Sequence, residues 1–99
     1  MTATPFAQLF SLRGKTAVVT GGSRGIGAMI ARGLLDAGAE VLISARKQHE
    51  LDAAQEALSA HGTVHAVCAD VSTLDGVAAL ADAVSMRFTT LDILVNNAG

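Results

Sequence analysis

Hydrophobic positions along the chain fall into two alternating patterns. Short apolar runs rich in β-branched residues indicate buried strands, and longer segments with apolar residues at helical spacing indicate helices. The strands are expected at 16–20, 40–45, 64–69 and 91–95. The helices are expected at about 26–37, 48–60 and 74–88. Strands that alternate with helices of this length are typical of βαβ units and a parallel sheet.

Details of the pattern locate the helix faces and ends. The apolar residues of the first helix recur at helical spacing at Ile26, Met29, Ile30, Gly33, Leu34 and Ala37. The second helix carries Leu51, Ala54, Ala57 and Leu58 on one face. Gly38 is a natural C-cap for the first helix, and Ser72 or Thr73 is the expected N-cap of the third. Residues 1–14 are expected to form a lead-in, because Pro5 disfavours regular structure near its start.

With right-handed crossovers, this order of elements predicts a Rossmann-like, doubly wound α/β half-fold with strand order 3-2-1-4. Residues 1–99 are therefore expected to be the amino-terminal, dinucleotide-binding part of a single domain. Ligands of such sheets bind beyond the carboxyl ends of the strands, at the switch point between the first and fourth strands. The distinctive polar residues of this chain fall at those ends, at 20–24, 44–46, 70 and 96–99.

A glycine-rich turn joins the first strand to the first helix. A helix N-terminus favours a phosphate because its N–H groups are unpaired and the helix dipole is positive there. Glycines let the phosphate approach the backbone. The spacing G-x-x-x-G-x-G differs from the common G-x-G-x-x-G fingerprint, so a tight turn without a ligand is the alternative. The turn consists of Gly21, Gly22, Ser23, Arg24, Gly25, Ile26 and Gly27.

The end of the second strand bears on the choice of cofactor. An acidic residue there would bind the ribose hydroxyls of NAD, whereas an arginine accommodates the 2′-phosphate of NADP. The chain has Arg46 there and no carboxylate nearby before Glu50, which predicts NADP(H). Arg24 could reach the same phosphate with its fork of donors. Alternatively, Arg46 and Lys47 are a solvated helix start, although cations there oppose the dipole.

Two further strand ends carry candidate contacts. Asp70 could accept a hydrogen bond from the adenine amino group, with the Val71 backbone beside it, or could serve only as a turn or cap residue. The fourth strand is followed by Asn97, Ala98 and Gly99. Asparagine is common in turns for its own backbone hydrogen bonds, so this last segment indicates a ligand only in combination with the others.

Four segments, taken together, resemble those of the classical short-chain dehydrogenase/reductases. They are TGGSRGIG at 20–27, AR at 45–46, DV at 70–71 and NNAG at 96–99. The chain looks most similar to the NADP(H)-dependent 3-oxoacyl reductases of that family, including the rhamnolipid-type β-ketoacyl reductases. The resemblance implies that the turn at 21–27 surrounds the pyrophosphate and the adenosine phosphate. It assigns the 2′-phosphate to Arg46, the adenine to Asp70 and Val71, and the ribose side and central strand to 97–99.

The same resemblance implies a reaction. Members of the family transfer hydride between the nicotinamide and a carbonyl or alcohol substrate, here with 3-oxoacyl compounds as candidates. Their catalytic Ser, Tyr-x-x-x-Lys pair and helix-borne Asn lie beyond NNAG, and this chain contains no tyrosine. The chain is therefore expected to be the cofactor-binding half of a reductase of roughly 250 residues, inactive alone. The full-length enzyme is expected to form a dimer or tetramer.

Composition narrows the possible partners. The net charge of −2 and the absence of a basic cluster argue against nucleic acid, and no apolar run approaches the length of a membrane span. The single cysteine, Cys68, fits a reducing compartment, so a cytoplasmic protein is expected. Cys68 is interpreted as a small buried residue of the third strand. His49, His61 and His65 lack metal-ligand spacing and are expected in solvent.

Two other function classes compete with the reductase. A non-catalytic NADP-binding sensor or scaffold could use the same half-fold. An S-adenosylmethionine-dependent methyltransferase also has a glycine-rich turn after its first strand. An acidic residue would be expected at the end of its second strand, so the pair Ala45-Arg46 argues against the methyltransferase.

Overall fold

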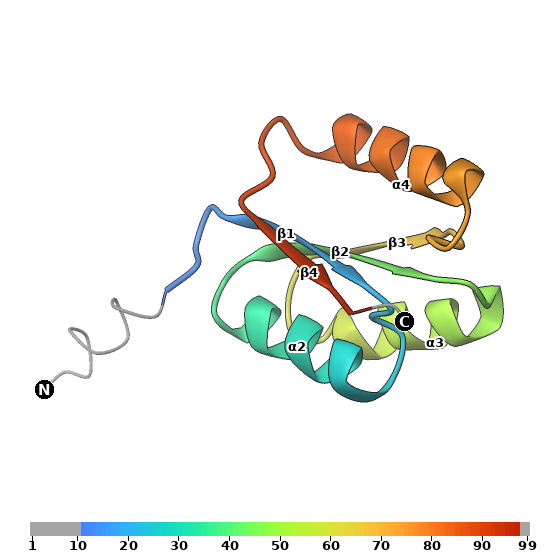
Figure 1. The fold of residues 1–99 in the computed structure, drawn as a ribbon. Helices are drawn as coiled ribbons and strands as arrows, with labels where there is room; N and C mark the ends of the chain where they lie inside the picture. The colour runs from blue at the N-terminus through green and yellow to red at the C-terminus, as the bar shows by residue number, and fades with distance from the viewer. Residues whose placement is uncertain (1–10, 98–99) are drawn as a thin grey trace, which may run out of the picture.

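Within residues 11–97, the part of the chain that the computed structural model describes, a four-stranded parallel sheet is flanked by three helices (Figure 1). The strands are β1 (Thr16–Thr20), β2 (Glu40–Ala45), β3 (Val64–Cys68) and β4 (Ile93–Asn96). The helices are α2 (Gly25–Asp36), α3 (Gln48–Leu58) and α4 (Leu74–Arg87). The order β3-β2-β1-β4 confirms the predicted topology. Most of the lead-in prediction, at residues 1–10, lies outside the described residues.

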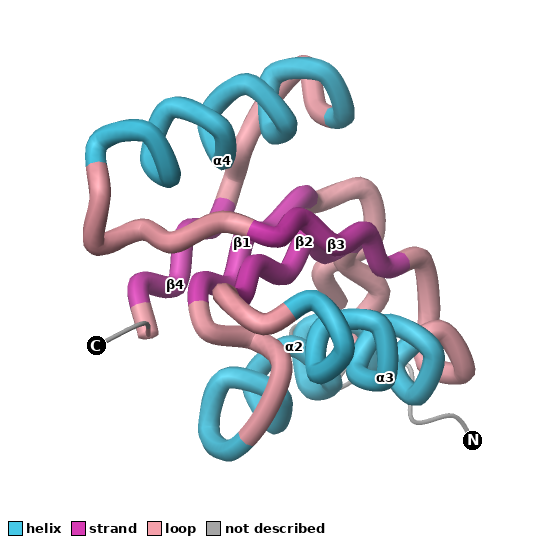
Figure 2. Tube along the Cα trace, turned by 90° about the vertical axis from the view of Figure 1, so that its right-hand side faces the viewer, coloured by secondary structure: helices cyan, strands magenta, loops and turns pink. Residues whose placement is uncertain are grey.

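The helices cover the two faces of the sheet unequally: α2 and α3 lie together on one face and α4 lies alone on the other (Figures 1 and 2). Successive residues of a strand point to opposite faces, so each strand serves both layers. Ala17 and Val19 of β1 belong to the α2–α3 core, whereas Val18 belongs to the core beneath α4. β2 pairs with β1 on one side and with β3 on the other, and its residues 41–43 are fully buried, as predicted.

The buried face of α2 differs from the predicted one. Gly27, Ala31 and Leu35 are its buried residues, whereas Ile26 and Met29 are 69% and 73% exposed. The predicted face was therefore only partly right: Ile30 and Leu34 are half-buried and pack against the core, whereas Ile26 and Met29 lie on a neighbouring, exposed stripe of the helix. Close packing of a helix on a sheet or a turn selects small residues at the contact, which look neutral in a hydrophobicity pattern. On α3, residues 51 and 58 are buried as predicted, but residue 57 is exposed.

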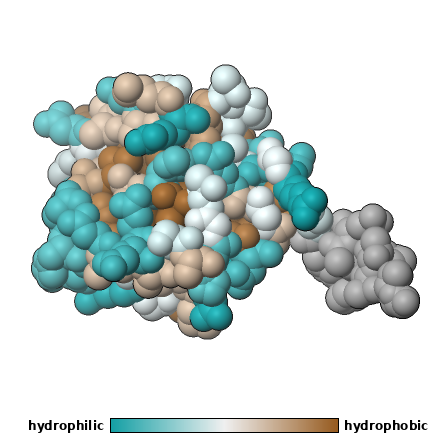
Figure 3. All heavy atoms as spheres, turned by 180° about the vertical axis from the view of Figure 1, so that it is seen from behind, coloured by the Kyte–Doolittle hydropathy of each residue, from teal (hydrophilic) through white to brown (hydrophobic). Residues whose placement is uncertain are grey.

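The α4 layer is thin. Leu80, Val84 and Phe88 pack against Val18 and Leu42 of the sheet, and much of the rest of the helix faces outward. Viewed from behind, hydrophobic surface is visible below the α4 layer, which lies at the top (Figure 3). β4 pairs with β1 alone and forms an edge of the sheet in residues 11–97. This is the position expected for the fourth strand of these 99 residues.

Three side chains depart from the predictions made for them. Cys68 is exposed rather than buried, because it ends the edge strand β3, and its Sγ donates to the backbone oxygen of Arg46 at 3.3 Å. His61 and His65 are half-buried rather than free in solvent. Each pairs with a carboxylate across the fold, His61 with Asp36 at 2.8 Å and His65 with Glu40 at 2.5 Å.

Candidate functional site

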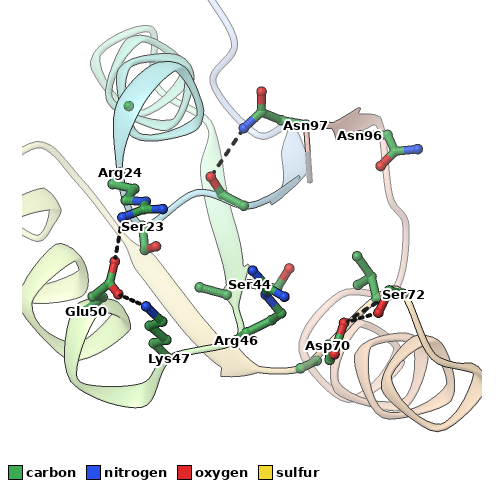
Figure 4. Close-up of a pocket in the computed structure, with 15 residues that line it drawn as sticks. Ser23, Arg24, Ser44, Arg46, Lys47, Glu50, Asp70, Ser72, Asn96 and Asn97 are labelled. Carbon is green, nitrogen blue, oxygen red and sulfur yellow. Dashed lines mark hydrogen bonds and ion pairs between the residues drawn. The ribbon is translucent and has the colours of Figure 1, made fainter. Parts of the chain in front are cut away.

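A cleft of about 560 Å³ opens at the carboxyl ends of the strands, where sequence reasoning placed the ligand (Figure 4). Its walls come from the turn after β1, the end of β2 with the start of α3, the loop after β3, and the end of β4. The lining residues are Gly21, Ser23, Arg24, Gly25, Ser44, Ala45, Arg46, Lys47, Glu50, Ala69, Asp70, Val71, Ser72, Asn96 and Asn97.

The glycine turn has an open side toward this cleft. Gly21 and Gly25 adopt φ angles of 67° and 59°, in the left-handed region that side chains disfavour. A Cβ atom at Gly25 would meet no heavy atom within 4 Å, so the space above its backbone is free. An anion can therefore approach the backbone at the start of α2.

The other two glycines of the turn hold it against the fold. A Cβ atom at Gly22 would lie 2.7 Å from Cγ2 of Ile43, and one at Gly27 would lie 2.0 Å from the Gly21 oxygen. The Gly22 N–H also donates to the Ser44 oxygen at 3.1 Å. These two residues serve the close packing of the turn on β2 and of α2 on the turn. They shape the cleft without lining it.

The end of β4 braces the same turn. The backbone N–H of Asn97 donates to Thr20 Oγ1 at 2.9 Å, and the Asn97 side-chain amide donates to the Gly21 oxygen at 3.3 Å. Figure 4 shows the side chain of Asn97 reaching across to the turn. Two segments more than 70 residues apart in sequence are thus joined at the cleft.

Three cations lie along one side of the cleft. Arg24 and Lys47 are the N-cap residues of α2 and α3, and neither helix start has a side-chain capping hydrogen bond. Positive side chains at a helix N-terminus oppose the dipole. By contrast, Thr73 caps α4 in the usual way by accepting from the Gly76 N–H at 3.0 Å. With Arg46 beside them, the two uncapped helix starts favour an anion in the cleft.

Asp70 faces this positive side from the loop after β3. Its Oδ1 accepts hydrogen bonds from the Ser72 hydroxyl at 2.6 Å and from the Ser72 N–H at 3.0 Å. These two hydrogen bonds, with a smaller contribution from the Arg46 charge, hold the pKa of the Asp70 carboxyl below its ordinary value. The group is an ionised acceptor at neutral pH.

The structure brings most of the predicted site residues together. Those that line the cleft are Gly21, Ser23, Arg24, Gly25, Arg46, Asp70, Val71 and Asn97. Gly22 and Gly27 are buried, and Ile26 is exposed outside the lining. Ala98 and Gly99 lie outside the described residues.

Seven lining residues lie outside the predicted site, and two of them, Glu50 and Ser72, pair with predicted site residues. The sequence pattern shows Glu50 only as a carboxylate some residues beyond the end of β2, although its position three residues after Lys47 puts both on one side of α3. The sequence suggests Ser72 as a helix cap, but the Asp-x-Ser spacing also signals an Asx turn that fixes the Asp70 carboxylate. Over residues 11–97, no group of three or more His, Cys, Asp or Glu side chains could hold a metal ion. None of the helices within these residues combines the length and the apolar character that a membrane span requires.

Comparison with known proteins gives consistent matches. Residues 15–99 match the short chain dehydrogenase family. A rhamnolipids biosynthesis 3-oxoacyl-[acyl-carrier-protein] reductase of Pseudomonas aeruginosa is 53% identical over 90 residues, which are 91% of this chain and 35% of that protein. The chain therefore spans about a third of the length of this relative.

Two solved structures share the fold. The Pseudomonas aeruginosa RhlG/NADP active-site complex matches with a TM-score of 0.87 and 53% identity, over 91% of this chain and 36% of that one. L-sorbose reductase from Gluconobacter frateurii, complexed with NADPH and L-sorbose, matches with a TM-score of 0.87 and 41% identity, over 91% of this chain and 35% of that one.

Proposed function

The chain belongs to the short-chain dehydrogenase family, and we propose that it is the cofactor-binding part of an NADP(H)-dependent oxidoreductase. The observation that carries the proposal is the cluster of Arg24, Arg46 and Lys47 beside an open glycine turn in one cleft. The structures of two relatives, described as NADP and NADPH complexes, support the same cofactor.

Each wall of the cleft has a proposed role. The pyrophosphate lies over Gly25 at the start of α2, where unpaired N–H groups and the helix dipole favour it. The 2′-phosphate is bound by Arg46 and Arg24, whose guanidinium groups can each engage two oxygens. Asp70 accepts from the adenine amino group, with the Val71 backbone beside it. Asn97 lies on the ribose side of the cofactor.

The proposed reaction is hydride transfer between the nicotinamide and a carbonyl or alcohol. The Pseudomonas relative is a 3-oxoacyl reductase by name, which makes 3-oxoacyl thioesters the first substrates to test. Reduction of a carbonyl needs a positioned proton donor, and the tyrosine that the resemblance implies is not among these 99 residues. The proposed role of this chain is to bind and orient the cofactor.

Cofactor selectivity tests the proposal. In the full-length protein, we expect Arg46→Ala to weaken NADPH binding by about 1.5–3 kcal/mol, the range for a hydrogen bond to a charged group. NADH lacks the 2′-phosphate, so its binding should barely change. Isothermal titration calorimetry with both nucleotides measures this difference.

Arg32→Ala is the matched control, because Arg32 lies on α2 and pairs with Asp36 outside the cleft. It should leave both affinities unchanged. Equal losses for NADPH and NADH in Arg46→Ala would show that Arg46 does not read the 2′-phosphate.

A separate assay distinguishes the enzyme from a non-catalytic NADP-binding sensor. The full-length protein is mixed with NADPH and a short 3-oxoacyl thioester, and the loss of NADPH absorbance is followed. Protein-dependent oxidation supports the reductase. Tight NADPH binding without oxidation for a panel of ketones and 3-oxoacyl thioesters would favour the sensor.

A further inference from the structure

A carboxylate lies within the cation cluster that we assign to the 2′-phosphate. Glu50, in the first turn of α3, points between two cations from different elements (Figure 4). Its Oε1 lies 3.7 Å from Nη1 of Arg24, and its Oε2 lies 3.6 Å from Nζ of Lys47. One carboxylate thus pairs with both N-cap residues of the two helices.

The three side chains differ in exposure. The Glu50 side chain is 24% exposed, whereas those of Arg24 and Lys47 are 79% and 64% exposed. The Glu50 carboxylate is therefore the most buried of the three charged groups, and the two cations extend over it from the surface. Ion pairs of this length between exposed side chains stabilise a fold little, so the cations are free to exchange partners.

A helix-dipole role does not account for the whole arrangement. An acidic residue in the first turn of a helix is favourable wherever it points. Glu50 also lines the cleft and reaches Arg24, which lies 26 residues earlier in the chain and belongs to the glycine turn. An anion that enters the cleft and binds Arg24 therefore competes with the Glu50 carboxylate.

A 2′-phosphate brings up to two negative charges and three strong acceptor oxygens to the same cations. It must take Arg24 away from Glu50 and then remain near the Glu50 charge. Like charges near a partly exposed surface repel appreciably. NADH has an uncharged hydroxyl at this position, so it does not have to displace Glu50 from Arg24 and is not repelled by the Glu50 charge.

We propose that Glu50 is a specificity-determining residue that lowers the preference of this protein for NADP(H) over NAD(H). In the free protein its carboxylate holds Arg24 and Lys47. On binding, the 2′-phosphate competes with that carboxylate for Arg24. This inference rests on the proposed function, because it requires that the 2′-phosphate binds at this cluster.

The test is the ratio of the NADH and NADPH dissociation constants, measured in the full-length protein for the wild type and for Glu50→Gln. Removing the charge should tighten NADPH binding about three- to tenfold and change NADH binding by less than about twofold. The gain should shrink as salt is raised toward 1 M, where the Debye length falls to about 3 Å. Because both constants come from the same preparation, a lower folded fraction cancels in the ratio.

Glu56→Gln is the matched control. It makes the same chemical change on α3, about 9 Å further along the helix axis and outside the cleft lining. Its ratio should equal that of the wild type. A second variant, Glu50→Ala, should raise the ratio in the same direction as Glu50→Gln.

An unchanged ratio in both Glu50 variants would overturn the inference. A selective loss of NADPH binding would also overturn it, since Glu50 would then hold the cations in place for the phosphate. The Arg46→Ala measurement separates these results from failure of the proposed function. If Arg46→Ala loses NADPH selectively and Glu50→Gln changes nothing, only the role of Glu50 is wrong.

Discussion

At the scale of the residue, the glycine turn shows one residue type meeting two different needs. Gly25 leaves its side of the backbone open, whereas Gly22 and Gly27 allow segments to approach more closely than a Cβ atom permits. The sequence motif does not separate these roles, because they depend on which neighbours the fold brings near. Substitution of Gly25 should therefore affect mainly the affinity for the ligand, whereas substitution of Gly22 or Gly27 should affect mainly the stability of the fold.

The first prediction concerns Gly25→Val. A valine there fills the space above the turn and strains a backbone whose φ is 59°. We expect full-length Gly25→Val to lose measurable NADPH binding and about 1–3 kcal/mol of stability. Titration with NADPH and denaturant unfolding measure the two effects.

Gly14→Val is the control, because Gly14 has a φ of 78° and open space around it but lies outside the cleft. It should lose stability and keep NADPH affinity. Wild-type affinity in Gly25→Val would place the pyrophosphate elsewhere.

The second prediction concerns the protonation of Asp70. The Ser72 hydrogen bonds lower the pKa of its carboxyl in the folded state, so folding favours the ionised form. Its contribution to stability is complete above the unfolded value of about 3.9 and is lost as pH falls through the lower folded value.

An NMR titration of the Asp70 carboxyl carbon in full-length protein should give a midpoint below about 3.9, and Ser72→Ala should raise it. A wild-type midpoint at or above that value, unchanged in Ser72→Ala, would contradict this interpretation.

At the scale of the element, α4 differs from the other two helices in how it begins. Thr73 caps α4 with its side chain, whereas the N-termini of α2 and α3 lie at the cleft and have no side-chain cap.

The third prediction is that Thr73→Ala costs about 1 kcal/mol of unfolding free energy, the usual value of an N-cap. Ser85→Ala removes a hydroxyl from the same helix that donates only to the Asp82 oxygen. This control should cost less than about 0.5 kcal/mol, and equal losses would contradict the capping role.

The elements themselves could be predicted well from the sequence. Apolar runs separated by turn residues gave the four strands, and the rules for parallel sheets gave their order. The packing face of α2 could not be read in the same way. Its contact residues Gly27 and Ala31 are small, so their burial depends on how closely the helix approaches the turn and the sheet.

The part of the candidate site that lies at strand ends could likewise be predicted from the sequence, but the part that lies on a helix could not. Arg46 and Asp70 end strands, and strand ends meet at one edge of a parallel sheet, so their convergence follows from topology. Glu50 lies within a helix and enters the cleft only because α3 begins beside the glycine turn. Such a contact depends on side-chain geometry that strand and helix patterns do not specify.

At the scale of the whole molecule, several large apolar side chains of the described residues are exposed. Met29 on α2, Leu74 and Met86 on α4, and Leu94 on the edge strand β4 are between 62% and 88% exposed. Exposed edges and apolar patches favour association. The Pseudomonas aeruginosa relative is about three times as long as the matched segment, so more chain is present there to cover such surfaces.

The fourth prediction is that these 99 residues, produced alone, associate and do not oxidise NADPH. Sedimentation velocity should show species larger than a monomer, and Leu94→Lys should reduce them by placing a charge on the edge strand. A stable monomer with cooperative unfolding would contradict the folding part of this prediction. Protein-dependent NADPH oxidation would contradict the catalytic part.

The most direct test of the proposed cofactor site is a crystal structure of the full-length protein with NADP⁺. We predict the 2′-phosphate within about 3.2 Å of donors on Arg46 and Arg24, the pyrophosphate above Gly25, and the adenine amino group at Asp70. An adenosine end bound away from both Arg46 and Asp70 would contradict the assignment of this cleft.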